Sequence, residues 1–184
     1  MINKNLNKIG IWTAIISFVV GTILLVLYYF SDSEIVAIVS VFYIIAAGVI
    51  NFVILLALLI KSRKDSENRK KYFKTAGLIL INIPIVLVYL YFIIGLSDTM
   101  RITFVNKTGK QIEDIEITGC EYEKINELKN NQSKTVWIDI TGDCSITVKY
   151  KIEDKIKKET VFEYVTTSMG KKATYRIGKD KPID

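Results

Sequence analysis

The sequence TAGLILINIPIVLVYLYFIIGL occupies residues 75–96, and SDTMRITF follows it at residues 97–104. The first stretch contains no Asp, Glu, Lys or Arg, and it exceeds the roughly 20 helical residues that cross a bilayer. From Arg101 onward, apolar and polar residues alternate instead. This alternation is typical of a β-strand with one buried face. The chain therefore changes here from a membrane-type helix to a strand-forming sequence.

Two further apolar stretches, residues 9–30 and 35–60, lie before this point and also lack charged side chains. A bilayer offers no water to the backbone, so each stretch is predicted to form an α-helix. The first is longer than the apolar core of a signal peptide and ends in Tyr28-Tyr29-Phe30 rather than in a cleavage site. The sequence thus predicts a transmembrane region of three helices, at about 9–30, 35–60 and 75–96, within residues 1–97.

The charges between these stretches predict the orientation. The short first connection contains Asp32 and Glu34, whereas the second, residues 61–74, is strongly basic (Lys61, Arg63, Lys64, Arg69, Lys70, Lys71 and Lys74). The positive-inside rule then places the N-terminus and the basic loop in the cytoplasm and residues 98–184 outside. Nucleic acid or an anionic lipid is the alternative partner of the basic loop. A topogenic role is the simpler explanation for so short a loop, and no nucleic-acid partner is expected.

Residues 98–184 are predicted to form a small all-β, sandwich-like domain, so the chain is a membrane protein of α + β class. The alternating runs 136–140 and 144–152 are separated by Thr141-Gly142-Asp143, which predicts an antiparallel hairpin. Ile112 is out of phase with Ile115 and Ile117 and indicates a bulge. Only residues 122–129 have a helical alternative, because two of their apolar residues lie three apart.

Cys120 and Cys144 are the two cysteines, and both lie in the predicted outer domain. An even pair in an oxidising compartment predicts a disulfide, with two buried free thiols as the alternative. The excess of Ile, Lys and Asn over Arg favours an AT-rich genome. We therefore expect a bacterial plasma membrane.

The chemistry that most enzymes need is missing from the sequence. The chain has no His, which excludes Ser-His and Cys-His catalysis and His-ligated metals. The carboxylate pairs Glu113-Asp114 and Glu153-Asp154 are predicted to be solvated charges in turns. No catalytic, cofactor-binding or metal site is expected, and the protein is predicted not to be an enzyme.

Trp137 is the candidate interaction residue of the outer domain. It alternates with Val136 and Ile138, so it belongs to the face opposite the core. An exposed Trp is typical of an interaction hot spot. The alternative, which the sequence slightly favours, is that Trp137 covers a second core or packs under a loop. Three other aromatic residues, Phe162, Tyr164 and Tyr175, are predicted to be core rather than a platform for a ligand.

The helices carry a few polar and small residues, including Ser17, Asn51 and Asn82. Such residues are typical of seams where membrane helices pack, whereas ion-coupled transport usually needs an ionisable residue within the span. The preferred interpretation is a lipid-embedded, non-enzymatic protein that presents its outer domain to a protein partner. An immunity protein or an envelope-complex component is one concrete version. The alternative is a subunit of a homo-oligomeric channel or transporter.

Overall fold

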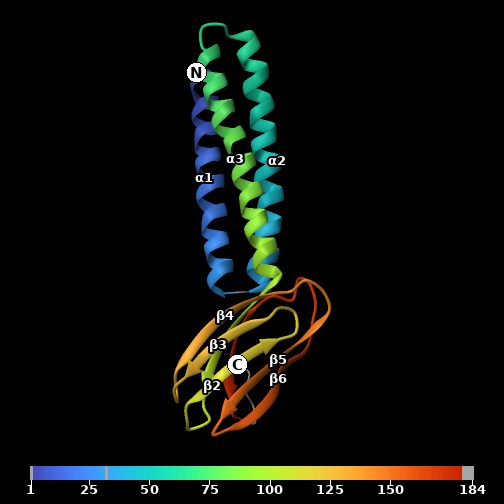
Figure 1. The fold of residues 1–184 in the computed structure, drawn as a ribbon. Coiled ribbons are helices and arrows are strands. Elements are labelled where there is room, and N and C mark those ends of the chain that lie inside the picture. Colours follow the sequence, from blue (N-terminus) through green and yellow to red (C-terminus); the bar gives the residue numbers. More distant parts are fainter. Residues whose placement is uncertain (1, 32, 180–184) are drawn as a thin grey trace. The chain divides into compact units, whose positions relative to one another are not determined.

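The computed structural model describes residues 2–31 and 33–179; for residues 2–4 and 34 it describes the backbone alone. The chain divides into two compact units, residues 1–93 and 94–184. The first is formed by α1 (Ile2–Ser31), α2 (Glu34–Lys64) and α3 (Arg69–Ser97), whose last turn belongs to the second unit. The second contains seven strands among the described residues. Three long apolar helices with a separate sheet domain confirm the coarse architecture predicted from sequence (Figure 1).

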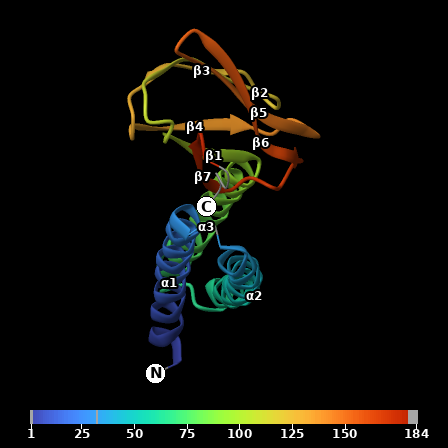
Figure 2. The same ribbon diagram turned by 90° about the horizontal axis from the view of Figure 1, so that it is seen from below.

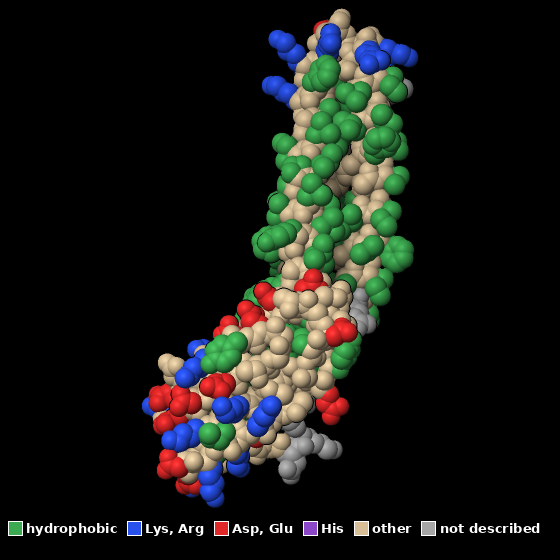
Figure 3. Space-filling model, turned by 45° about the vertical axis from the view of Figure 1, so that its right-hand side comes forward, with side chains coloured by type: hydrophobic (Ala, Val, Ile, Leu, Met, Phe, Trp, Pro, Cys, Tyr) green, Lys and Arg blue, Asp and Glu red, His purple; other side chains and the backbone are tan. Residues whose placement is uncertain are grey.

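The three helices are long and apolar enough to cross a membrane, over Asn5–Ser31, Ile35–Lys64 and Arg69–Ser97. Hydrophobic side chains cover the helical part, and Lys and Arg gather at its end where α2 and α3 are joined (Figure 3). Both helices extend into the predicted basic loop, since Lys and Arg are good helix formers. The connection between α2 and α3 is therefore much shorter than residues 61–74. The acidic side chains of Asp32 and Glu34 lie outside the described residues.

The helices form a buried cluster near the basic end. Its members are Ala14, Leu58, Tyr72 and Ile79. Gly10 of α1 lies against Thr75 of α3, and a Cβ on Gly10 would come within 2.7 Å of the Thr75 methyl group. A small residue at position 10 thus lets two helices approach closely, as expected for a packing seam.

The second unit is a β-sandwich of two sheets. One sheet has the order β4-β1-β7 and the other β3-β2-β5-β6 (Figures 1 and 2). The strand bounds are β1 (Thr99–Asn106), β2 (Ile112–Thr118), β3 (Glu123–Leu128), β4 (Ser133–Asp139), β5 (Cys144–Ile152), β6 (Lys155–Val165) and β7 (Lys172–Ile177). Neighbouring strands are antiparallel except β1 and β7, which are parallel. Inward side chains of both sheets form one buried core.

The predicted hairpin of residues 136–152 is wrong. β4 pairs with β1, whereas β5 pairs with β2 and β6 in the other sheet. The short connection through Gly142 therefore passes from one sheet to the other. Alternation of apolar residues shows which face of a strand is buried, but it does not show which strand lies beside it.

The helical alternative for residues 122–129 is also wrong, because this segment contains β3. Ile125 and Leu128 pair with Ile115 and Ile112 of β2, and all four are buried. The two strands thus share the same irregular spacing, and the pairing of β2 with β5 shifts between Glu113 and Glu116. This irregularity confirms the bulge predicted from Ile112. It also corrects the predicted turn at Glu113-Asp114, since Asp114 lies within β2 with a φ of +46°.

Candidate functional site

Trp137 lies on β4 and points away from the core. Its strand neighbours Val136 and Ile138 are buried, whereas 48% of Trp137 is exposed. The interpretation that Trp137 covers a second core is therefore wrong for this structure. A half-exposed indole on an outer sheet face needs a support that holds it in place.

Arg101 of β1 provides that support. It is the register partner of Trp137, and its guanidinium carbon lies 5.7 Å from the centre of the indole ring. Only 3% of Arg101 is exposed. A cation held against an aromatic face attracts it through the ring quadrupole. The indole thus packs against a buried charged group.

The residues around this pair make up what we call the Trp137 face, the outer face of β4, β1 and β7. Lys172 lies on the other side of Arg101, and Thr103 is flanked by Thr135 and Thr174 in the next row. The hydroxyls of Thr103 and Thr135 are 2.8 Å apart and hydrogen bonded. The Trp137 face thus combines one aromatic residue with cations and hydroxyl groups.

The outer face of the other sheet has a different character. Lys124 pairs with Asp114 at 3.0 Å, Lys149 with Glu116 at 3.1 Å and Lys151 with Asp154 at 2.9 Å. These side chains are largely exposed, and such surface pairs are typical of a solvated face. Of the two outer faces, the Trp137 face is therefore the better candidate for binding.

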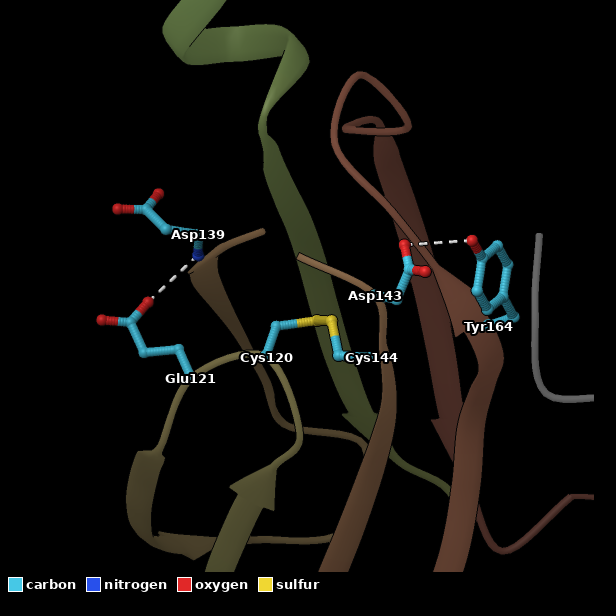
Figure 4. The surroundings of a disulfide bond; sticks show 6 residues. All are labelled: Cys120, Glu121, Asp139, Asp143, Cys144 and Tyr164. Atoms are coloured by element: carbon cyan, nitrogen blue, oxygen red, sulfur yellow. Dashed lines mark hydrogen bonds between the residues drawn. A yellow bond between two sulfur atoms is a disulfide. The ribbon is translucent and has the colours of Figure 1, made fainter. Parts of the chain in front are cut away.

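Cys120 and Cys144 lie at disulfide distance, with their Cα atoms 5.3 Å apart. The pairing predicted from sequence agrees with this geometry, which joins the loop after β2 to the start of β5 (Figure 4). Next to it, the Glu121 carboxylate accepts the backbone N–H of Asp139 at 3.0 Å. Tyr164 donates to Asp143 at 3.1 Å. Tyr164 is 55% exposed, so its predicted place in the core is wrong.

Glu159 of β6 connects the two sheets through its carboxylate. It accepts hydrogen bonds from the hydroxyls of Tyr150 at 2.6 Å and Tyr175 at 2.9 Å, which come from opposite sheets. The pKa values of both tyrosines are raised above the ordinary value. Burial is the larger cause, and the neighbouring Glu159 carboxylate is the second. Tyr175 is core, as predicted. Among the described residues, no group of three or more Cys, Asp or Glu side chains could hold a metal ion.

A second candidate site is a cavity of about 300 Å³ among the three helices, lined mostly by apolar side chains. Asn51 of α2 lines it and donates to the Ser17 hydroxyl at 2.7 Å and to the Ala47 carbonyl at 2.8 Å. Asn82 of α3 donates to the Ala14 carbonyl at 3.0 Å. The Asn51 Oδ1 atom, by contrast, is buried and has no hydrogen-bond partner among the described residues.

No protein-family model and no curated protein matches the chain. Among solved structures, it is similar to an NMR structure of a protein from Eubacterium rectale, at 13% identity and a TM-score of 0.35. That similarity covers 47% of this chain and 84% of the other. A likeness at this level carries no argument about fold or function, so the function must be inferred from the two sites themselves.

Sequence reasoning found Trp137 but missed Arg101 and Glu159. Trp137 was visible because it is a large aromatic residue on the outward face of an alternating strand. Arg101 is equally out of place on a buried position, but its partner lies 36 residues away, and only the register of β1 with β4 brings them together. Glu159 likewise depends on two strands from different sheets. No short-range signal reveals such contacts.

Proposed function

We propose that this protein is an integral membrane protein that presents its β-sandwich to a protein partner on the outer side of the membrane. The three apolar helices support insertion, with the bilayer as their surroundings. The basic connection between α2 and α3 supports a cytoplasmic N-terminus. The cysteine pair supports an oxidising location for the sandwich. A bacterial plasma membrane is the setting that agrees best with the composition.

The observation that carries the proposed function is Trp137, held half-exposed over the buried Arg101. Aromatic and Arg side chains are enriched among the residues that dominate protein interfaces. A binding face also gains from being ordered before the partner arrives, because less entropy is then lost on association. The role is non-enzymatic, and an immunity protein or an envelope-complex component is the concrete form that we favour.

Site-specific photocrosslinking tests this proposal. A benzophenone amino acid replaces Thr135, next to Trp137 on the Trp137 face, in cells that express the full chain. The matched control is Thr147 on the outer face of the other sheet, which forms the same kind of hydroxyl pair with Thr118. The proposal predicts one discrete protein adduct from position 135 that is absent from position 147. Equal adducts at both positions would contradict it.

The alternative is that the helices form a channel or transporter subunit. The cavity among the helices, with Asn51 and Asn82 in its lining, is the observation that favours it. An oligomer in detergent together with ion flux in liposomes would support this second function. A monomer without flux would count against it.

A further inference from the structure

The basic end of the helices is explained only in part by the proposed orientation. The positive-inside rule needs cations in this connection, but it does not require them at any particular position. In α2 the cations lie in the last turn, where they complement the helix dipole. In α3, by contrast, Arg69, Lys70 and Lys71 begin the helix, and its first turn contains no acidic residue. Cations there oppose the dipole, so an anion beside them would stabilise this end of α3.

The connection between α2 and α3 does not supply that anion. The Asp65 carboxylate accepts hydrogen bonds from the backbone N–H of Asn68 at 3.1 Å and from the Tyr72 hydroxyl at 3.3 Å. Among the described residues, Arg69 and Lys70 form no ion pair, and both side chains are exposed. An anion beside these two cations would therefore come from outside the chain.

Arg69 lies against an exposed aromatic ring at the level of the lipid headgroups. It is the first residue of the apolar span Arg69–Ser97. Its guanidinium carbon lies 5.6 Å from the centre of the ring of Phe73, which follows one helical turn later and is 48% exposed. A contact with one ring does not occupy all five N–H donors of a guanidinium. Arg69 can therefore still bind a phosphate group, which is the partner that its planar fork of donors matches best.

The surface of α3 that follows this cation toward the middle of the span fits an acyl chain. Gly77 and Leu80 follow Phe73 at spacings of four and three, so the three residues lie on one face of the helix. Leu80 is 46% exposed, and a Cβ added to Gly77 would meet nothing within 4 Å. A free phosphate or a nucleic acid would use the cations but not this apolar line. A phospholipid uses both.

We propose that the start of α3 is a binding site for an anionic phospholipid. Its phosphate contacts Arg69 and Lys70, and one acyl chain lies along Phe73, Gly77 and Leu80. A topogenic role of the basic connection is compatible with this site, because the same cations can serve both. The inference goes beyond the proposed function and depends only on membrane insertion.

Quenching by brominated lipids tests this inference on the full chain, reconstituted in vesicles of equal parts phosphatidylcholine and phosphatidylglycerol. The reporter is Phe73→Trp in a chain whose two native tryptophans are replaced, by Trp12→Phe and Trp137→Phe. Bromine on an acyl chain quenches only an adjacent indole, so brominating one lipid at a time shows which lipid lies beside position 73. Random mixing gives equal quenching by the two lipids. We expect brominated phosphatidylglycerol to quench with a preference of about fivefold.

Three variants of this reporter show whether the preference depends on the site. Arg69→Gln should abolish it, whereas Arg69→Lys keeps the charge and should retain about half of it or more. The matched control is Arg63→Gln, which removes an exposed Arg of the same basic end from α2 and should leave the preference unchanged.

Equal quenching by the two lipids in the parent reporter would overturn the inference. An unchanged preference in Arg69→Gln, an equal loss in Arg69→Gln and Arg63→Gln, or loss of the preference when inorganic phosphate is added at constant ionic strength would also overturn it. The photocrosslinked adduct at position 135 would be unaffected by such a failure, so the two proposals can fail separately.

Discussion

At the scale of single residues, Trp137 separates binding from stability. Its indole is half-exposed, so Trp137→Ala removes little buried surface from the core. We expect partner capture to weaken by about 2 kcal/mol or more, roughly thirtyfold, as for other interface hot spots. The free energy of unfolding should fall by only about 1 kcal/mol, chiefly through the lost contact with Arg101. Affinity and thermal melting are measured on the same preparation. A large fall in the melting temperature with unchanged binding would show that Trp137 is structural.

Tyr150 and Tyr175 predict a loss of stability at alkaline pH. Burial and the Glu159 carboxylate raise the pKa of both hydroxyls in the folded protein. In the unfolded chain the tyrosines ionise near pH 10. Their contribution is therefore complete below pH 10 and decreases as the pH rises above it, by up to about 1.4 kcal/mol per pH unit for each tyrosine.

The test compares the wild type with the double variant Tyr150→Phe, Tyr175→Phe from pH 8.5 to 11. We expect the melting temperature of the wild type to fall more steeply above pH 10 than that of the variant. Lys124 and Lys151, whose pKa values are raised by Asp114 and Asp154, are present in both proteins and cancel in the comparison. Parallel curves would contradict the assignment.

At the scale of elements, the disulfide joins the connection after β2 to the first residue of β5. Closing the loop between Cys120 and Cys144 stabilises the fold by roughly 3.5 kcal/mol in the chain-entropy model. We expect Cys120→Ser and Cys144→Ser to lower the free energy of unfolding by the same amount, and non-reducing gels of wild-type membranes to shift on thiol addition. Free alkylation of both wild-type thiols would show that the bond does not form in the cell.

The loop between β6 and β7 contacts the junction of α3 and β1. Gly170 donates its backbone N–H to the Ser97 carbonyl at 2.7 Å. A Cβ at position 170 would lie 2.5 Å from the Ser97 carbonyl oxygen and 2.6 Å from the Thr99 nitrogen. Gly170→Ala should therefore destabilise the sandwich by about 1–3 kcal/mol through overpacking.

Gly142→Ala is the matched control for this variant. Position 142 lies in another loop of the same unit, and a Cβ there would meet nothing within 4 Å. Chemical unfolding of the sandwich should show no loss of stability for this variant. Equal effects of the two substitutions would mean that the contact between Gly170 and the end of α3 does not matter.

The strands show what could be predicted from the sequence. The alternating runs 136–140 and 144–152 identified their buried faces correctly, because side-chain direction is a local property of a strand. Tyr164 of β6, by contrast, was placed in the core and is exposed. The sheet order could not be predicted, since β4 and β5 are adjacent in sequence but belong to different sheets. The three-residue spacing of Ile125 and Leu128 suggested a helix. It belongs instead to a strand, because their partners in β2, Ile115 and Ile112, have the same spacing. Arg101 could not be assigned to the candidate site from the sequence, because only the pairing of β1 with β4 places it beside Trp137.

At the scale of the whole molecule, the account depends on which side of the membrane each unit occupies. Labelling of an introduced cysteine can determine the side of each unit, because both described cysteines form the pair and no free cysteine would react. Lys149 is a suitable reporter position on the sandwich, since it is exposed and outside the Trp137 face. Ser66 is the corresponding position in the connection between α2 and α3.

The most direct test is labelling of Lys149→Cys and Ser66→Cys in intact cells with a membrane-impermeant maleimide. The account predicts that Lys149→Cys is labelled in intact cells, whereas Ser66→Cys is labelled only after the membrane is permeabilised. Labelling of Ser66→Cys alone in intact cells would place the sandwich in the cytoplasm. That result would contradict the proposal that this protein presents the Trp137 face outside the cell membrane.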